Sequence, residues 1–94
     1  MKELTLDASN WKTKDDFYAA LFIAVGAPEW HGRNFNALRD SIGTGGINKI
    51  ETPYKLIITN IANASKDAQE IIVDFQSLID GLKNEGVGVD LETK

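Results

Sequence analysis

The chain has 94 residues, of which 43% are hydrophobic, and it carries a formal net charge of −4. A chain of this length accommodates one hydrophobic core, so we expect a single domain over residues 1–94. The lack of cysteine excludes a disulfide framework and a thiol nucleophile, and the acidic charge disfavours direct binding of nucleic acid, which requires clustered Lys and Arg.

The sequence shows no pattern of a secretory signal at its start and no membrane-length segment. Residues 1–7 alternate in polarity and do not form a secretory signal, and no apolar run approaches the length that crosses a membrane. A secreted domain of this size would more often contain disulfides. We therefore expect a cytoplasmic protein that does not bind a membrane.

The first predicted elements are a strand over residues 3–7 and a helix that begins after Thr13. Thr13 and Asp16 have the spacing of a capping box, in which side chains satisfy the free N–H groups of a helix start. Gly26 is predicted to end this helix, and Pro28 follows at the distance expected of a stop. Between these ends, apolar residues recur at helical intervals, namely Phe17, Tyr18, Ala20, Leu21, Phe22, Ala24 and Val25.

A second, shorter helix is predicted from about Phe35 to Ile42. At about 100° per residue, Phe35, Leu38 and Ile42 share one side of it, which we expect to be buried. Asn34 can cap its start, because its side-chain oxygen can accept a free backbone N–H. Gly43 stands where a glycine commonly ends a helix.

The opposite side of this second helix is polar. Asn36, Arg39 and Asp40 have the spacing of neighbours on a helix surface, so we expect them to face water together. Trp30 and His31 lie in the preceding loop, and Trp is enriched at the energetic centres of protein interfaces. The loop and the polar side together predict a protruding surface that enters a cleft of another protein, although Trp30 could equally cover the core.

The remaining elements are a central strand, a long helix and a final strand. The strand over residues 54–59 contains Leu56, Ile57 and Ile58 without alternation, which predicts burial on both faces and a central place in the sheet. Residues 44–46 form a glycine-rich connector, and residues 47–51 are expected to form one irregular turn. The long helix runs from a cap at Ser65 to about Asn84, with an apolar stripe, and residues 87–91 form the last strand. The stripe consists of Ala68, Ile71, Ile72, Phe75, Leu78, Ile79 and Leu82.

The chain contains few residues suited to catalysis. His31 is the only histidine, so paired histidine catalysis within one chain is excluded. Glu29 and His31 could in principle act as base and acid on a ribonucleotide, but only Arg33 and Arg39 stand near them to stabilise developing negative charge. No group of potential metal ligands has the spacing of a metal site. We therefore expect no enzymatic activity, no cofactor and no metal.

Residues 28–40 read P-E-W-H-G-R-N-F-N-A-L-R-D, and this segment resembles the barstar family. The order of elements extends the resemblance over essentially the whole chain, although it is specific only between residues 28 and 42. It implies an α/β fold with a small three-stranded parallel sheet packed by three to four helices. Proteins of this family are small inhibitors in the bacterial cytoplasm, whose loop and second helix occlude the active site of a ribonuclease. The resemblance places Asp40 at the principal inhibitory aspartate and aligns other residues with loop contacts, namely Trp30, His31, Gly32 and Asn34.

Three positions depart from the family pattern. Asn36 stands where a second acid is expected, Arg39 replaces an aromatic residue, and His31 replaces a second tyrosine. The charged residues from Glu29 to Asp40 sum to zero, whereas an acidic surface would be steered by the positive cleft of a nuclease. We therefore expect a cognate enzyme whose cleft is less basic or differently shaped, such as a toxin domain.

The sequence thus predicts an immunity-type inhibitor that forms a 1:1 heterodimer with a ribonuclease or a ribonuclease-type toxin. Asp80 or Gly81 on the long helix could add contacts at the rim of this interface. Two alternatives stay open, a barstar-like regulatory or scaffold module with a non-nuclease partner and a minor enzyme that uses Glu29 and His31. The predicted partner-binding residues are Trp30, His31, Gly32, Arg33, Asn34, Asn36, Arg39, Asp40, Gly43, Thr44 and Gly45.

Overall fold

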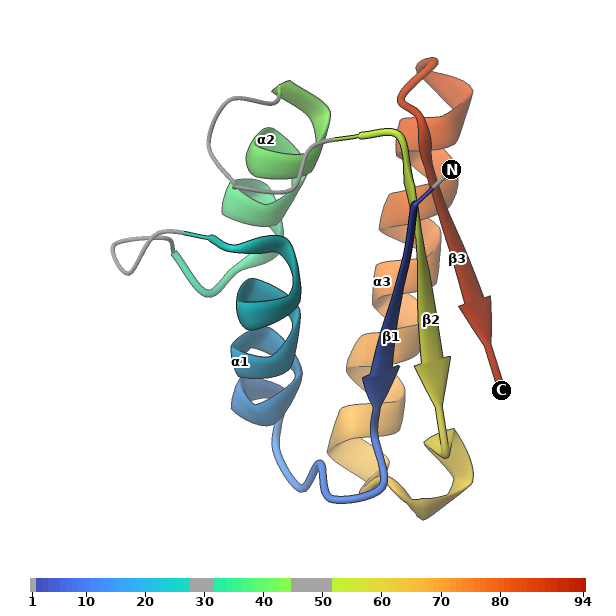
Figure 1. The fold of residues 1–94 in the computed structure, drawn as a ribbon. Coiled ribbons are helices and arrows are strands. Elements are labelled where there is room, and N and C mark those ends of the chain that lie inside the picture. The colour runs from blue at the N-terminus through green and yellow to red at the C-terminus, as the bar shows by residue number, and fades with distance from the viewer. Residues whose placement is uncertain (1, 28–31, 45–51) are drawn as a thin grey trace.

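The computed structural model describes residues 2–27, 32–44 and 52–94, and it places three parallel strands in the order β1-β2-β3 (Figure 1). The predicted α/β class and the central position of residues 54–59 are therefore confirmed. The irregular turn predicted over residues 47–51 lies outside the described residues. The elements are β1 (Lys2–Asp7), α1 (Lys14–Val25), α2 (Phe35–Thr44), β2 (Tyr54–Thr59), a 3-10 turn (Ile61–Asn63), α3 (Lys66–Asn84) and β3 (Val89–Thr93).

The core lies between the sheet and the three helices. Alternate strand residues join the helical side chains in one buried cluster, and α3 packs against β3, α1 and α2. The rings of Phe17 and Phe75 meet edge to face at the centre of this cluster, with centroids 5.1 Å apart. All stripe residues predicted for α3 are buried except Leu78, which is half-buried and packs against the cluster. The strand residues in the cluster are Leu6, Tyr54, Leu56, Ile58, Val89 and Leu91.

The other face of the sheet is polar. Ile57 is only 9% exposed, yet its register partners on this face are Thr5 and Glu92 rather than a helix. An ion pair between Lys55 and Glu92, with 3.1 Å between Nζ and Oε1, lies beside it. The prediction that Ile57 is buried is confirmed, but side chains of the neighbouring strands, not a second helical layer, provide the cover.

The predicted helix caps are present. Thr13 and Asp16 form the capping box of α1, and Gly26 ends that helix in the left-handed region at φ 69°. Asp16 accepts hydrogen bonds from the N–H groups of Lys12 and Thr13, and these bonds lower the pKa of its carboxyl group. Ser65 caps α3, because its Oγ accepts the N–H of Ala68 at 3.2 Å. Local side-chain chemistry thus fixes where two of the three helices begin.

Two predicted elements have different boundaries in the structure. The last strand spans Val89–Thr93 rather than residues 87–91. Its start is delayed because residue 87 belongs to a tight turn in which its N–H donates to Leu82 O and its carbonyl accepts from Val89 N–H. The second helix continues through Gly43 to Thr44 and does not end at the glycine. A Cβ at Gly43 would lie 3.2 Å from a methyl group of Leu82, so close packing against α3 is what favours glycine there.

Tyr54 carries a buried hydroxyl group with an unusual environment. The residue is 1% exposed, its hydroxyl has no hydrogen-bond partner in the described part of the chain, and burial raises its pKa to about 12. In the unfolded chain the same group ionises near pH 10. The free energy of unfolding should therefore fall as the pH rises from about 10 to about 12, because only the unfolded state ionises readily in that window.

Replacement of Tyr54 by phenylalanine tests this assignment. Tyr54→Phe removes an unsatisfied buried hydroxyl, so we expect unchanged or higher stability at pH 7 and a smaller loss above pH 10. Urea denaturation of both proteins across this pH range measures the difference. A loss of about 1 kcal/mol or more at pH 7 would show instead that the hydroxyl makes a stabilising hydrogen bond.

Candidate protein-binding surface

Helix α2 lies on the molecule with one side buried and the other exposed, as the sequence predicts. Leu38 and Ile42 are 2% and 3% exposed, and the half-buried Phe35 packs against the core, with its ring 6.4 Å from that of Tyr18. These contacts hold α2 beside α1 and α3, near the end of the sheet where the strands begin (Figure 1). The polar side chains Asn36, Arg39 and Asp40 therefore face solvent.

The start of α2 is fixed by the segment that precedes it. The Oδ1 atom of Asn34 accepts the N–H of Ala37 at 2.8 Å, which confirms the predicted cap. Gly32 packs tightly here, because a Cβ at this position would lie 3.0 Å from Asn34 Nδ2 and 3.4 Å from Ala37 Cβ. A larger residue at Gly32 would therefore push against the cap and the first turn of α2.

Arg33 is tied to the first helix. Its Nη1 lies 2.7 Å from Oδ2 of Asp15, which stands in the first turn of α1. The two side chains remain about half and two-thirds exposed, so the pair contributes little to stability. Its consequence is electrostatic, because Asp15 balances the positive charge that the sequence places next to the cap of α2.

Arg39 is likewise engaged within the chain. Its Nη2 forms an ion pair with Oε2 of Glu85, the residue that follows α3. Gly81 lies under this arginine, since a Cβ there would be 3.9 Å from Arg39 Nη1. The guanidinium therefore lies along the C-terminal end of α3 rather than projecting freely from α2.

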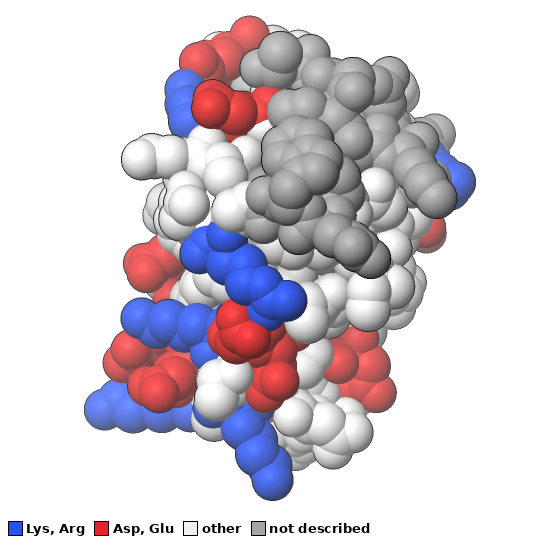
Figure 2. Space-filling view, turned by 90° about the vertical axis from the view of Figure 1, so that its left-hand side faces the viewer, with Lys and Arg blue, Asp and Glu red and all other residues white. Residues whose placement is uncertain are grey.

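These two ion pairs change the charge of the surface. Each arginine is balanced by an acid from another element, whereas Asp40 is exposed and forms no ion pair within the described ranges. The zero sum over residues 29–40 thus understates the acidity around Asp40. Figure 2 shows the side of the molecule formed by α1 and α2, where acidic and basic side chains lie next to one another rather than in patches of one sign.

Two hollows flank α2. One, of about 440 Å³, lies between the start of α2, α1 and α3, and the other, of about 300 Å³, lies between the polar side of α2 and the end of α3. Asp40 lines the second hollow, so a side chain that enters it meets this carboxylate. The first hollow is lined by Lys14, Asp15, Tyr18, Arg33, Asn34, Phe35, Ile71 and Asp74, and the second by Arg39, Asp40, Gly43, Leu82, Glu85 and Val87.

The structure brings together most of the predicted partner-binding residues that it describes. Gly32, Arg33 and Asn34 precede α2, and Asn36, Arg39, Asp40 and Gly43 lie on it. Trp30, His31 and Gly45 lie outside the described residues, as does Glu29, and Thr44 is described only as the last residue of α2. Of the two possible rim residues, Gly81 lies beside Arg39, and Asp80 is exposed and accepts a hydrogen bond from Gln76.

Sequence reasoning missed Asp15 and Glu85 as parts of this surface. Both are separated from their arginines along the chain, Glu85 by 46 residues, so no local motif links them. Only the packing of α2 against α1 and α3 brings these acids to the arginines. Within residues 2–27, 32–44 and 52–94, no group of three or more potential metal ligands is found, and no helix there is both long and apolar enough to cross a membrane.

Comparison with known proteins identifies a family. The family model described as barstar, the barnase inhibitor, matches residues 1–92. The chain belongs to the barstar family. A search of curated proteins returned no match. Barstar proteins are inhibitors rather than enzymes, and the matched residues 1–92 include α2, the helix that carries Asp40.

The cap of α2 makes a measurable contribution. Replacing Asn34 by alanine removes the acceptor for Ala37 N–H, and we expect a loss of about 0.5–2 kcal/mol in the free energy of unfolding. Urea denaturation measures this loss, and Asn36→Ala, on the exposed side of the same helix, is the control. Equal effects of the two substitutions would show that the cap does not hold α2 in solution.

Proposed function

We propose that this barstar-family protein is an immunity-type inhibitor that binds a ribonuclease or a ribonuclease-type toxin and occludes its active site. The complex contains one copy of each protein and forms in the cytoplasm, where it protects the producing cell. The observation that carries the proposal is the exposed carboxylate of Asp40, which forms no ion pair among the described residues and lies on the outer side of a helix whose other side is buried in the core.

The mechanism is steric and electrostatic. A nuclease cleft is lined with basic groups because it binds phosphodiesters, and a carboxylate that enters it takes the place of a phosphate. Asp40 pairs with those basic groups, while Gly32, Asn34 and Asn36 supply contacts around it. In the described part of α2, Leu38 and Ile42 lock the helix to the core, so the carboxylate is positioned before binding.

The residues that depart from the family pattern define which ribonuclease is inhibited. Asn36 supplies an uncharged amide where the pattern has an acid, and Arg39 is held by Glu85 beside the hollow that Asp40 lines. A partner that fits this surface requires a cation opposite Asp40 and tolerates a guanidinium beside it. We therefore propose that the cognate enzyme has a cleft with fewer basic side chains than a partner matched to two acids.

An inhibition assay tests the proposal. The isolated protein should leave RNA intact, and it should abolish the activity of its cognate ribonuclease at a molar ratio of one to one. Barnase serves as the first probe. The second probe is the product of the neighbouring gene, which is first tested for capture by this protein in a pull-down. RNA cleavage by the isolated protein would favour the minor enzyme, and capture of a protein without nuclease activity would favour a regulatory or scaffold module.

A further inference from the structure

Strand β3 lies at one edge of the sheet, and the bonds that flank it show which backbone groups face outward. Gly88 O accepts the N–H of Tyr54 at 3.0 Å, and Lys94 N–H donates to Ile58 O at 2.9 Å. In a parallel ladder, successive residues direct their backbone groups alternately toward the partner strand and away from it. The groups of Val89, Leu91 and Thr93 therefore point to the open edge.

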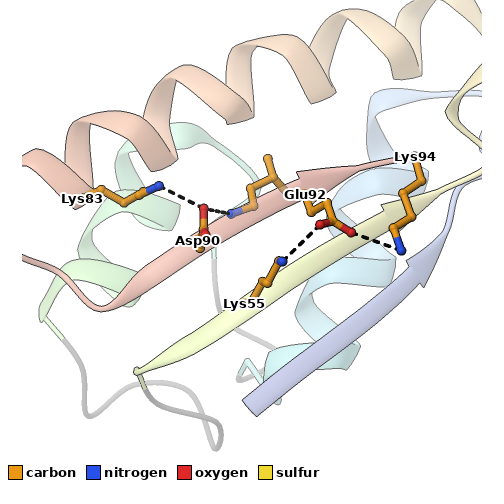
Figure 3. Close-up of polar contacts among 6 residues, drawn as sticks. Lys55, Lys83, Asp90, Glu92 and Lys94 are labelled. Atoms are coloured by element: carbon orange, nitrogen blue, oxygen red, sulfur yellow. Dashed lines mark hydrogen bonds and ion pairs between the residues drawn. The ribbon is translucent and has the colours of Figure 1, made fainter. Parts of the chain in front are cut away.

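Two of these outward N–H groups are already bonded within the chain. The N–H of Val89 donates to Val87 O at 2.9 Å, and that of Leu91 donates to Oδ1 of Asp90 at 2.8 Å. The same Asp90 oxygen accepts Lys83 Nζ, from the last turn of α3, at 3.0 Å (Figure 3). An incoming strand could pair with the N–H of Leu91 only by displacing the Asp90 carboxylate, which Lys83 holds in place, from that N–H.

The hydrogen bonds around Asp90 favour the ionised form of its carboxyl group. The hydrogen bond from Lys83, followed by that from Leu91 N–H, lowers the pKa of the Asp90 carboxyl group. The carboxylate is therefore ionised throughout the neutral range and holds both donors there. Asp90 also forms its backbone pairing toward β2, opposite Lys55, so only its side chain reaches the edge.

An apolar hollow lies beside the edge of β3, and a strand added at this edge would cover it. It has a volume of about 300 Å³ and lies between α3, the 3-10 turn and the end of β3. Val73 on its rim is 66% exposed, so apolar surface continues from the hollow to the solvent. An open strand edge next to apolar surface is a site of self-association unless it is blocked. The hollow is lined by Ile61, Ile72, Val73, Gln76, Ser77 and Thr93.

We propose that the Asp90 carboxylate, held by Lys83, caps the edge of β3 and prevents it from pairing with β3 of a second copy of this chain. Without the cap, two edges can meet antiparallel about a two-fold axis, which extends the sheet across both copies. The same contact would cover the hollow at Val73 in each copy. This inference concerns the open edge of β3 rather than the Asp40 side chain, and it does not depend on the proposed inhibition.

The oligomeric state of two matched variants tests the proposal. Asp90→Ala removes the cap, whereas Glu92→Ala removes another acid of β3 that is paired with lysines but accepts no backbone N–H from the described residues. In analytical ultracentrifugation over a concentration series, the wild type and Glu92→Ala should stay monomeric. The weight-average mass of Asp90→Ala should rise toward twice the monomer value.

Hydrogen exchange at Leu91 provides a second readout. In dilute Asp90→Ala, the Leu91 amide should exchange faster than in the wild type, and at high concentration it should become protected by the new strand pair. Adding Val73→Lys to Asp90→Ala should restore the monomer, because it places a charge in the hollow. If Asp90→Ala fails to fold, Lys83→Met replaces it in both measurements. We expect smaller changes in the weight-average mass and in the exchange rate of the Leu91 amide for this variant.

Two results would overturn the proposal. One is an Asp90→Ala protein, or Lys83→Met in its place, that stays monomeric at all concentrations with unchanged exchange at Leu91. The other is a wild-type protein that already dimerises with protection of the Leu91 amide, since the cap would then not block the edge.

Discussion

Replacing Asp40 by alanine is expected to weaken the complex with the inhibited ribonuclease by about 30- to 5,000-fold. Removing one partner of a buried, hydrogen-bonded charge pair at an interface costs about 2–5 kcal/mol, a range that draws in part on a complex of the barstar family itself, and each 1.4 kcal/mol is tenfold in Kd. Much of this loss arises because the basic groups of the enzyme stay buried without a counter-charge. Inhibition titrations or calorimetry with the captured ribonuclease measure the change.

The matched control for Asp40 is an exposed acid of α3. Glu70→Ala removes the same charge from a position on a different surface, so only the long-range attraction should weaken, with a change in Kd well below tenfold. Measuring Kd at two salt concentrations separates the long-range attraction from the buried charge pair. Salt screens exposed charges strongly and a buried pair much less. Equal, small losses for Asp40→Ala and Glu70→Ala would contradict the proposed orientation of the complex.

Leu38→Ala is expected to cause the largest loss of stability among changes on α2. The side chain is 2% exposed and belongs to the core cluster, so truncation should lower the free energy of unfolding by about 2–5 kcal/mol. The size within that range depends on how far α2 can collapse into the space that is left. Chemical denaturation measures the loss, and circular dichroism shows whether the helices persist.

Asn36→Ala controls for the Leu38 substitution, since it changes an exposed residue of the same helix. We expect its effect on stability to stay within about 0.5 kcal/mol. Leu38→Ala should also weaken inhibition, because a loosened α2 must be ordered when the complex forms. A Leu38→Ala protein with native stability would show that α2 is not anchored by this contact.

The helix starts could be predicted because the sequence encodes them locally. Thr13, Asn34 and Ser65 each bond to a backbone N–H three residues later, and that spacing is visible without a structure. The buried side of α3 follows from the period of its apolar residues in the same way. These features depend on neighbours within one or two helical turns, so they are visible in the sequence alone.

The boundaries and charges that the sequence could not predict depend on contacts between distant segments. Residues 87–91 have the composition of a strand, but pairing with β2 starts only after the turn at Val87. The residues next to Arg33 and Arg39 in the sequence do not predict their ion pairs. The packing of α2 brings Asp15 and Glu85 to them, and these acids balance their charge. A charge sum over residues 29–40 therefore omits two acids that lie beside the arginines of the folded surface.

The most direct test of the account is to map the ribonuclease contact on the isotope-labelled protein by NMR. Addition of the unlabelled ribonuclease should shift or broaden amide signals of residues 32–43 and of the nearby end of α3, at a saturating ratio of one to one. The amides of β1 and of Glu92 on β3, which lie in the sheet rather than on α2, should change little. Changes centred on β3 and the Val73 hollow, with α2 unaffected, would contradict the claim that Asp40 and its helix occupy the cleft of the enzyme.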